Sequence, residues 1–156
     1  MPFQKTENRT GLARVEGKEF FLSTTLTGSS NPKKYTLTTS ATKTTVLTDF
    51  KLVPNLAANA IVSLYEGIAD EGVGTGSAIT TYNSNRTQWS PDARLSENGY
   101  VSSSNSSGSL LWKNMFNATT QPEIELTLKK NTKYMFDVLA DSAPTYWGLK
   151  INWLEL

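Results

Sequence analysis

Large apolar and polar residues alternate along several stretches of this chain, which is the pattern of a β-strand with one buried face. The clearest example is residues 123–128, where Ile124, Leu126 and Leu128 fall on one face. The opposite face of the same stretch carries two glutamates and a threonine. This stretch therefore predicts a strand that packs on a core with one side and meets solvent with the other.

The same alternation continues through residues 133–139 and 146–156, so three consecutive strands are expected to close the chain. Asn131 lies in the first connection and tolerates a left-handed turn conformation, and Pro144 favours a turn in the second. Both connections are short enough for antiparallel hairpins. The apolar positions of the last strand suit core burial, so we expect this strand to belong to a sheet.

Further strands are expected at residues 18–23, 33–40, 43–53, 59–66, 78–82 and 110–116. Within residues 43–53, the alternation puts Val46, Phe50 and Leu52 on one face together with Thr48. No window of eleven residues carries an apolar stripe of helical period. The pattern predicts an all-β protein of about eight or nine antiparallel strands, folded as a jelly-roll-like β-sandwich.

The length of 156 residues fits one domain with one core. Residues 1–17 mix charges with an isolated Phe3, and we expect them to form an extended N-terminal arm. Residues 18–156 are then a single β-sandwich domain. Within it, residues 83–109 lack strand alternation and predict an unusually long loop, of the kind that often carries function.

The composition excludes several kinds of chemistry. The chain has no histidine and no cysteine, so it has no Ser-His-Asp or Cys-His catalytic arrangement, no disulfide and no zinc-thiolate site. Fifteen basic and fourteen acidic residues leave a net charge of +1, which does not indicate a nucleic-acid partner. No stretch has the length of a membrane span, and no signal peptide is recognised, so we expect no membrane partner.

Two remaining motifs are compatible with chemistry but are better explained by structure. Glu123 and Glu125 lie two residues apart on the polar face of one strand, where both are expected to be solvated and charged. The segment DEGVGTG, residues 70–76, lacks the lysine and helix of a phosphate loop and the alternating carboxylates of a calcium loop. We therefore expect no catalytic residue, no metal and no cofactor.

Two longer segments carry a resemblance to known proteins. They are VSLYEGIADEGVGTGSAITTYNSNR, residues 62–86, and LTLKKNTKYMFDVLADSAPTYWGLKINWLEL, residues 126–156. They resemble a family of small virion proteins of tailed bacteriophages, the capsid cement or decoration proteins. The matching residues are Leu64, Tyr65, Glu66, Gly67, Gly74, Thr75, Tyr82, Asn83, Asn85, Arg86, Leu128, Lys129, Asn131, Thr132, Lys133, Tyr134, Trp153 and Glu155.

The resemblance implies a jelly-roll-like sandwich that sits on the outer surface of the phage head and bridges neighbouring major capsid subunits. It implies a virion protein on the capsid surface, assembled in the host cytoplasm, with no catalysis. It also implies a homo-oligomer, either a dimer or a trimer. The residues expected to bind the capsid or a neighbouring copy are Phe3, Arg9, Arg14, Tyr82, Asn83, Asn85, Arg86, Trp89 and Tyr100.

One alternative shares the same fold. A carbohydrate-binding domain, or a receptor-recognition domain of the tail-fibre type, would use Trp89, Tyr100 and Trp112 to stack on sugar rings. The sequence leaves this alternative open, as it leaves open which capsid is bound and what the loop at residues 88–109 contacts. An enzyme is a third and weaker interpretation, because it needs a carboxylate pair that the sequence does not offer.

Overall fold

A computed structural model describes residues 12, 16–29, 32–68, 77–86, 94–98, 108–141 and 146–156. Eleven strands lie in these residues, and they confirm the all-β class. The strands are β1 (Glu19–Thr27), β2 (Lys33–Thr38), β3 (Thr45–Pro54), β4 (Ala60–Glu66), β5 (Ser77–Ala78), β6 (Tyr82–Asn83), β7 (Arg94–Asn98), β8 (Ser109–Phe116), β9 (Leu126–Leu128), β10 (Lys133–Ala140) and β11 (Tyr146–Glu155).

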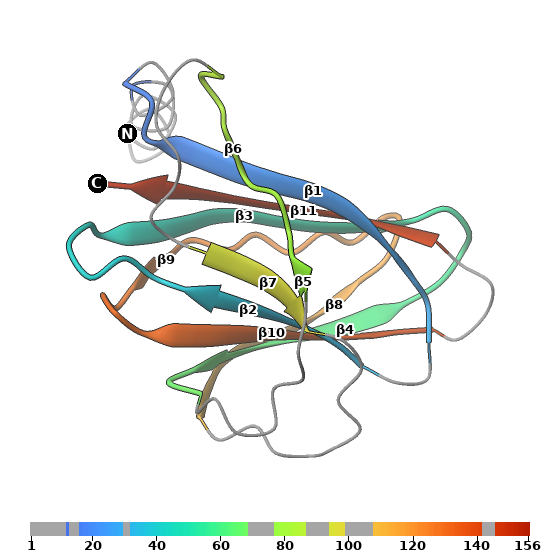
Figure 1. Ribbon diagram of the computed structural model, residues 1–156. Coiled ribbons are helices and arrows are strands. Elements are labelled where there is room, and N and C mark those ends of the chain that lie inside the picture. The colour runs from blue at the N-terminus through green and yellow to red at the C-terminus, as the bar shows by residue number, and fades with distance from the viewer. Residues whose placement is uncertain are drawn as a thin grey trace, which may run out of the picture.

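The strands form two antiparallel sheets that pack face to face, which confirms the predicted β-sandwich. The first sheet has the strand order β6-β1-β11-β3-β9, and the second sheet has the order β5-β7-β2-β10-β4-β8. Figure 1 shows β1, β11 and β3 in one layer above β2, β10 and β4 in the other. β5 and β6 contain only two residues each, which accounts for the difference from the expected eight or nine strands.

Four of the strand pairings are nested. β1 pairs with β11, β2 with β10, β3 with β9, and β4 with β8. The first and second halves of the chain are therefore interleaved strand by strand. Two further pairings, β11 with β3 and β10 with β4, join these pairs into the two sheets.

The core lies between the two sheets. Phe50 of β3 stacks on Phe136 of β10 with ring centroids 5.1 Å apart, and it meets Phe116 of β8 edge-on at 5.4 Å. Because β3 belongs to the first sheet and the other two strands to the second, these rings join the layers, and each pair adds about 0.5–1.5 kcal/mol beyond its burial. The largest fully buried side chains are Trp147, Trp153, Tyr35, Tyr134, Phe20, Phe50, Phe116, Phe136, Leu22, Leu37, Leu47 and Leu52.

β3 contains a β-bulge. Asn152 of β11 pairs with Asp49, but the next residue of β11, Trp153, pairs with Leu47. Thr48 is therefore the extra residue, and two positions of β3 oppose one position of β11. An extra residue shifts the alternation of side chains by one position beyond the bulge.

This shift corrects the predicted faces of β3. Val46 was expected to share the buried face of Phe50, and this prediction is wrong. Leu47 joins Phe50 in the main core instead, while Val46 packs against Leu154 in a second, separate cluster. The sequence gives no sign of the bulge, because Thr48 is an ordinary residue for a strand.

Two expected connections also differ. Residues 83–109 were expected to lack a strand, but they contain β7, which pairs with β2 in the second sheet. The segment RLSEN has one large apolar residue, so alternation could not reveal it. The strand expected at residues 78–82 is divided, because β5 belongs to the second sheet and β6 to the first. The chain crosses between the sheets within this short segment.

The closing strand belongs to a sheet, as expected, and lies at its centre. The hairpins expected on either side of β10 are wrong, because β9 and β11 lie in the first sheet and β10 in the second. β11 lies between β1 and β3 in the first sheet. Leu156 and Thr44 also exchange two backbone hydrogen bonds of 2.9 Å, which fasten the residues after β11 beside β3. Of the arm expected at residues 1–17, only Leu12, Glu16 and Gly17 lie within the described residues.

Candidate functional site

The expected partner-binding residues fall into two groups. Tyr82, Asn83, Asn85 and Arg86 lie together on β6 and the turn that follows it, at one edge of the first sheet. Phe3, Arg9, Arg14, Trp89 and Tyr100 lie outside the residues that the structure describes. The structure therefore places one part of the expected contact surface.

Asn83 supports the fold rather than the surface. Its side chain is buried, and its Nδ2 donates a hydrogen bond of 2.8 Å to the carbonyl of Gly17. Its Oδ1 accepts a hydrogen bond of 2.8 Å from the backbone N–H of Asn85. An asparagine that bonds the chain two residues further on fixes a tight turn. Asn83 thus holds the turn that carries Arg86.

Tyr82 and Arg86 form a stacked pair on the surface. The guanidinium carbon of Arg86 lies 4.9 Å from the centroid of the Tyr82 ring, a cation–π contact. The Tyr82 ring in turn packs on Phe21 of β1, with centroids 5.7 Å apart. Tyr82 is 41% exposed, and Arg86 is also exposed. We call these two residues the Tyr82–Arg86 stack.

Backbone geometry aims Arg86 at the ring. Arg86 has a φ of 66°, which is uncommon for a residue with a side chain. Its N–H donates a hydrogen bond of 3.0 Å to the carbonyl of Asn83, which closes the turn. Held in this way, the guanidinium keeps a planar set of donors that matches a carboxylate or a carbonyl edge of a partner. Sequence analysis did not identify Phe21, which supports the stack through the pairing of β1 with β6.

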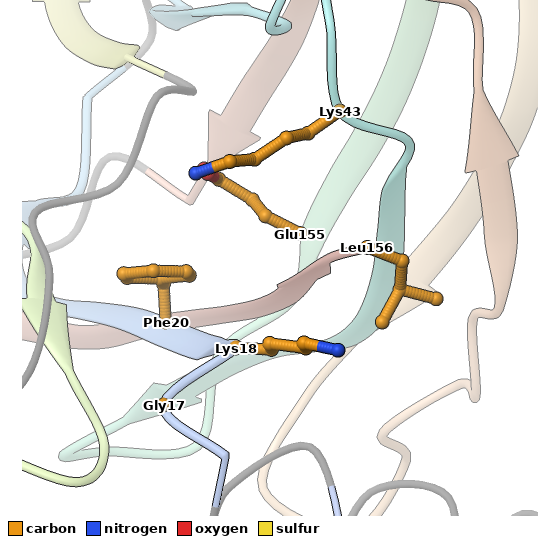
Figure 2. Close-up of a pocket in the computed structure, with 6 residues that line it drawn as sticks. All are labelled: Gly17, Lys18, Phe20, Lys43, Glu155 and Leu156. Carbon is orange, nitrogen blue, oxygen red and sulfur yellow. The ribbon is translucent and has the colours of Figure 1, made fainter.

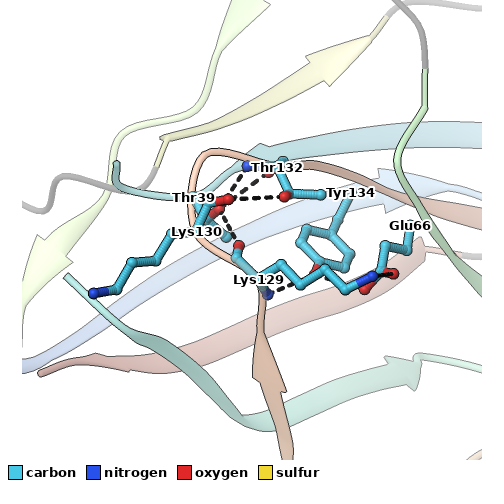
Figure 3. A network of polar contacts seen from close by, with 6 residues as sticks. All are labelled: Thr39, Glu66, Lys129, Lys130, Thr132 and Tyr134. Atoms are coloured by element: carbon cyan, nitrogen blue, oxygen red, sulfur yellow. Dashed lines mark hydrogen bonds and ion pairs between the residues drawn. The ribbon is translucent and has the colours of Figure 1, made fainter. Parts of the chain in front are cut away.

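A second polar cluster joins β4 to the turn between β9 and β10, which lie in different sheets (Figure 3). The Lys129 ammonium lies 2.7 Å from Oε1 of Glu66, and the Tyr134 hydroxyl donates to Oε2 of the same carboxylate at 2.8 Å. The Tyr134 oxygen accepts a hydrogen bond of 2.8 Å from the backbone N–H of Lys129. Glu66 and Lys129 lie 63 residues apart in sequence, so two distant motifs of the resemblance meet here.

The electrostatics of this cluster follow from its contacts. The hydrogen bond from Lys129, followed by that from Tyr134, holds the pKa of Glu66 below its usual value. Burial raises the pKa of Tyr134 to about 12, and the adjacent Glu66 carboxylate acts in the same direction. Glu66 is therefore an ion and Tyr134 a neutral donor across the physiological range.

The same turn is fastened to Thr39, the residue that follows β2. Its Oγ1 donates a hydrogen bond of 2.6 Å to the carbonyl of Lys129 and accepts one of 3.0 Å from the N–H of Thr132. Figure 3 shows Thr39 within the curve of the turn, with dashed lines to Lys129 and to Thr132. Asn131 has a φ of 48° in this turn, which confirms the predicted left-handed conformation. The cluster is a structural clamp.

The last motif of the resemblance is also structural. Nε1 of Trp153 donates a hydrogen bond of 3.1 Å to Oε1 of the buried Glu155. Figure 2 shows the side chain of Glu155 pointing toward that of Lys43 beside a pocket lined by Phe20 and Leu156. The volume of the pocket is ≈ 80 Å³. Small-molecule sites usually measure roughly 300–1,000 Å³, so this pocket does not fit a ligand of sugar size.

The acidic residues in the described part of the chain form no candidate metal site. They contain no group of three or more Asp or Glu residues that could hold a metal ion. Glu123 and Glu125 are both exposed, as the sequence predicted. The segment at residues 70–76 lies outside the described part of the chain. No helix in that part is long and apolar enough to cross a membrane.

Trp112, which the carbohydrate alternative used as a stacking platform, packs on the core instead. Its ring contacts Phe116 with centroids 5.8 Å apart and Phe50 at 6.5 Å. It is only partly exposed, on the inward face of β8. The two other aromatic residues of that alternative, Trp89 and Tyr100, are outside the described ranges.

A surface that sequence analysis missed lies on the outer face of the second sheet. Leu139, Ile61 and Met115 are paired across β10, β4 and β8, so they form one row. Their exposed fractions are 42%, 42% and 49%. On the outer face of its own strand each is flanked by polar residues, and only the strand order brings the three together.

The fold and these surfaces define the class of protein as a two-layer antiparallel β-sandwich with an exposed aromatic–arginine stack and an exposed apolar row. No protein-family model matches the chain, and no curated protein shows significant sequence similarity to it. The function is therefore argued from the fold, the surfaces and the motifs.

Proposed function

We propose that this protein is a capsid cement, or decoration, protein of a tailed bacteriophage. It would bind the outer surface of the head and bridge major capsid subunits, as a virion protein assembled in the host cytoplasm. The observation that carries the proposal is where the fold places the motifs that resemble this family. Those motifs meet in the clamp of Glu66, Lys129 and Tyr134, and they leave Tyr82 and Arg86 stacked on the surface.

The nested pairing supports a jelly roll as the specific form of the sandwich. In a jelly roll, an antiparallel ladder of eight strands wraps so that the first strand pairs with the last and each following pair lies inside the previous one. Four pairs of this protein follow that order, from β1 with β11 to β4 with β8. The fold suits a protein whose role is adhesion, because it offers two broad sheet faces.

The Tyr82–Arg86 stack is proposed as one contact with the major capsid protein. Tyrosine and arginine are among the residue types that dominate interface energies. A capsid lattice presents many equivalent sites, so weak contacts to adjacent subunits act together at high effective concentration. The proposed partners are the major capsid protein and further copies of this chain, as a dimer or trimer. Nucleic acid, membrane and catalysis have no part in the proposal.

The test is to add the purified protein to undecorated capsids of the same virus and to measure occupancy and resistance of the capsids to heat. Arg86→Asn removes the guanidinium but keeps a residue that tolerates a positive φ. We expect this variant to lose about tenfold or more of the capsid affinity, because a central contact is removed. Lys150→Asn is the matched control, since Lys150 is an exposed cation on the central β11.

The result would count against the proposal if the unmodified protein failed to bind these capsids. If it binds but Arg86→Asn and Lys150→Asn bind equally well, the stack is not the contact. The carbohydrate-binding alternative would be favoured by clear hits on a glycan array together with no capsid association.

A further inference from the structure

The outer face of the second sheet carries an apolar row where a solvated sheet face is normally polar. The row consists of Leu139 on β10, Ile61 on β4 and Met115 on β8. All three are more than two-fifths exposed, at 42%, 42% and 49%. Contiguous apolar side chains that are bordered by polar residues mark a surface that a partner covers.

A charged row borders this apolar row on one side. It consists of Asp137 on β10, Ser63 on β4 and Lys113 on β8, again paired across the strands. Burial raises the pKa of Asp137, and the charges of Lys34 and Lys113 act against that shift. A partly buried carboxylate needs a cation if a partner removes more water from it.

A polar row borders the other side. Asn59 N–H donates a hydrogen bond of 2.9 Å to Oδ2 of Asp141, and Asn117 Nδ2 donates one of 3.2 Å to Oδ1 of Asn59. Each border of the apolar row thus carries an acidic residue on the β10 side, Asp137 on the first border and Asp141 on the second. On the β8 side the first border carries Lys113 and the second carries Asn117.

We infer that this face binds a second copy of the chain, through a two-fold axis that runs parallel to β4. This symmetry places β10 of one copy over β8 of the other. Ile61 then faces Ile61 of the second copy, and Leu139 faces Met115 of the second copy. Asp137 faces Lys113 of the second copy, so each carboxylate gains a cation, and the interface contains this contact twice.

The charges select this axis over the other in-plane possibility. A two-fold axis perpendicular to the strands would also place the apolar rows on each other, but it would exchange their two borders. Asp137 of one copy would then face Asp141 of the other, with a carboxylate against a carboxylate. Like charges in a desolvated contact oppose association, so the axis along β4 is favoured.

The inference concerns self-association alone and is independent of capsid binding, because its test uses only the purified full chain. Sedimentation velocity over a range of concentrations should show a dimer above about 10 μM. Ile61→Lys should weaken dimerisation at least tenfold, because it places two ammonium groups at the centre of the contact. Val53→Lys is the matched control, since Val53 is 46% exposed on β3 in the first sheet. This variant should dimerise as the unmodified protein does, because the first sheet is not part of the proposed contact.

A charge-exchange experiment tests the axis. Asp137→Lys places Lys against Lys113 of the second copy, and Lys113→Asp places Asp against Asp137 of the second copy, so each variant alone should remain monomeric. In an equimolar mixture, both contacts between the two different variants join opposite charges. The mixture should therefore form a heterodimer of the two variants. Mixing cannot restore the homodimer of either variant, because the charges that face each other there are still alike.

Thermal unfolding of each variant separates misfolding from lost association, because a folded monomer keeps a cooperative transition. A wild-type chain that stays monomeric at about 200 μM would overturn the inference. A trimer, or a dimer that Ile61→Lys leaves intact, would also overturn it. A mixture of folded charge variants that stays monomeric would reject the proposed axis.

Discussion

Single hydroxyl and amide groups decide how the edges of this sandwich are held. The Tyr134 hydroxyl links the Glu66 carboxylate to the backbone of Lys129, and the Asn83 amide links the turn after β6 to Gly17. Alternation put Tyr134 on the apolar face of its strand, whereas Asn83 was expected to bind a partner. The partners of these groups come from distant parts of the chain, so the sequence did not reveal them.

Tyr134→Phe is expected to destabilise the protein by about 1–3 kcal/mol, because it removes the hydroxyl that serves both Glu66 and the N–H of Lys129. Tyr134 is fully buried, so water cannot replace the lost partner. Chemical denaturation measures the change. Tyr146→Phe is the control, since Tyr146 is 61% exposed and its loss of a hydroxyl should have almost no effect. Equal stability of both variants would contradict the role of the Tyr134 hydroxyl.

The same residue predicts how stability depends on alkaline pH. Folding raises the pKa of Tyr134 from 10.0 to about 12, so the folded state favours the neutral phenol. This contribution to stability is fully present below pH 10.0 and is lost as the pH rises toward 12. Denaturation midpoints are measured from pH 8 to pH 12. They should decrease between pH 10.0 and about 12, and the decrease should be smaller in Tyr134→Phe. A parallel fall in both proteins would assign the effect to other groups.

Individual strands show what alternation can and cannot predict. Residues 123–128 and 133–139 were expected as strands, and they correspond to β9 and β10, because a regular apolar period of two reports one buried face directly. The predicted faces of β3 were right at Phe50 and wrong at Val46, which precedes Thr48, since a bulge depends on how two strands pair. β7 was missed because its pairing with β2, and not its own apolar residues, makes it a strand.

Deletion of Thr48 tests the bulge. Without the extra residue, Asp49 and Leu47 become neighbours and still pair with Asn152 and Trp153 of β11, so Leu47 keeps its place in the core. We expect this variant to fold and to lose only about 1 kcal/mol in the free energy of unfolding, from the hydrogen bond of Thr48 to the carbonyl of Asn152. Deletion of Lys51, a regularly paired residue of β3, is the contrast, because Phe50 and Leu52 would become neighbours and could not both face the core. This deletion should cost roughly 2–5 kcal/mol by chemical denaturation. Similar losses in the two variants would contradict the bulge at Thr48.

At the scale of the whole molecule, the sandwich depends on strands from both halves of the chain. β11 lies between β1 and β3, and β10 lies between β2 and β4. Neither sheet can form from one half alone. The stability of each layer is therefore shared across the sequence, and the strands that come last in the chain are central in space.

Removal of residues 149–156 is expected to give an insoluble product. The truncation deletes most of β11, including the buried Ile151 and Trp153, and leaves unpaired edges on β1 and β3. Such edges promote aggregation between chains. Removal of Leu156 alone is the control, since it costs the backbone bonds to Thr44 and should leave a soluble protein. The yield of soluble protein and its circular dichroism measure both, and a folded, soluble truncation would refute the prediction.

The sequence by itself determined the all-β class, most strands and most of the core, because side-chain alternation and turn residues act locally. By motif and residue type it also singled out Tyr82 and Arg86 as expected contact residues, and this role stays a prediction. The tertiary structure decided the strand order, the bulge at Thr48, the clamp around Glu66 and the row of Leu139, Ile61 and Met115. Each of these depends on which strands become neighbours, and that choice is made by the burial of the whole core rather than by any single segment.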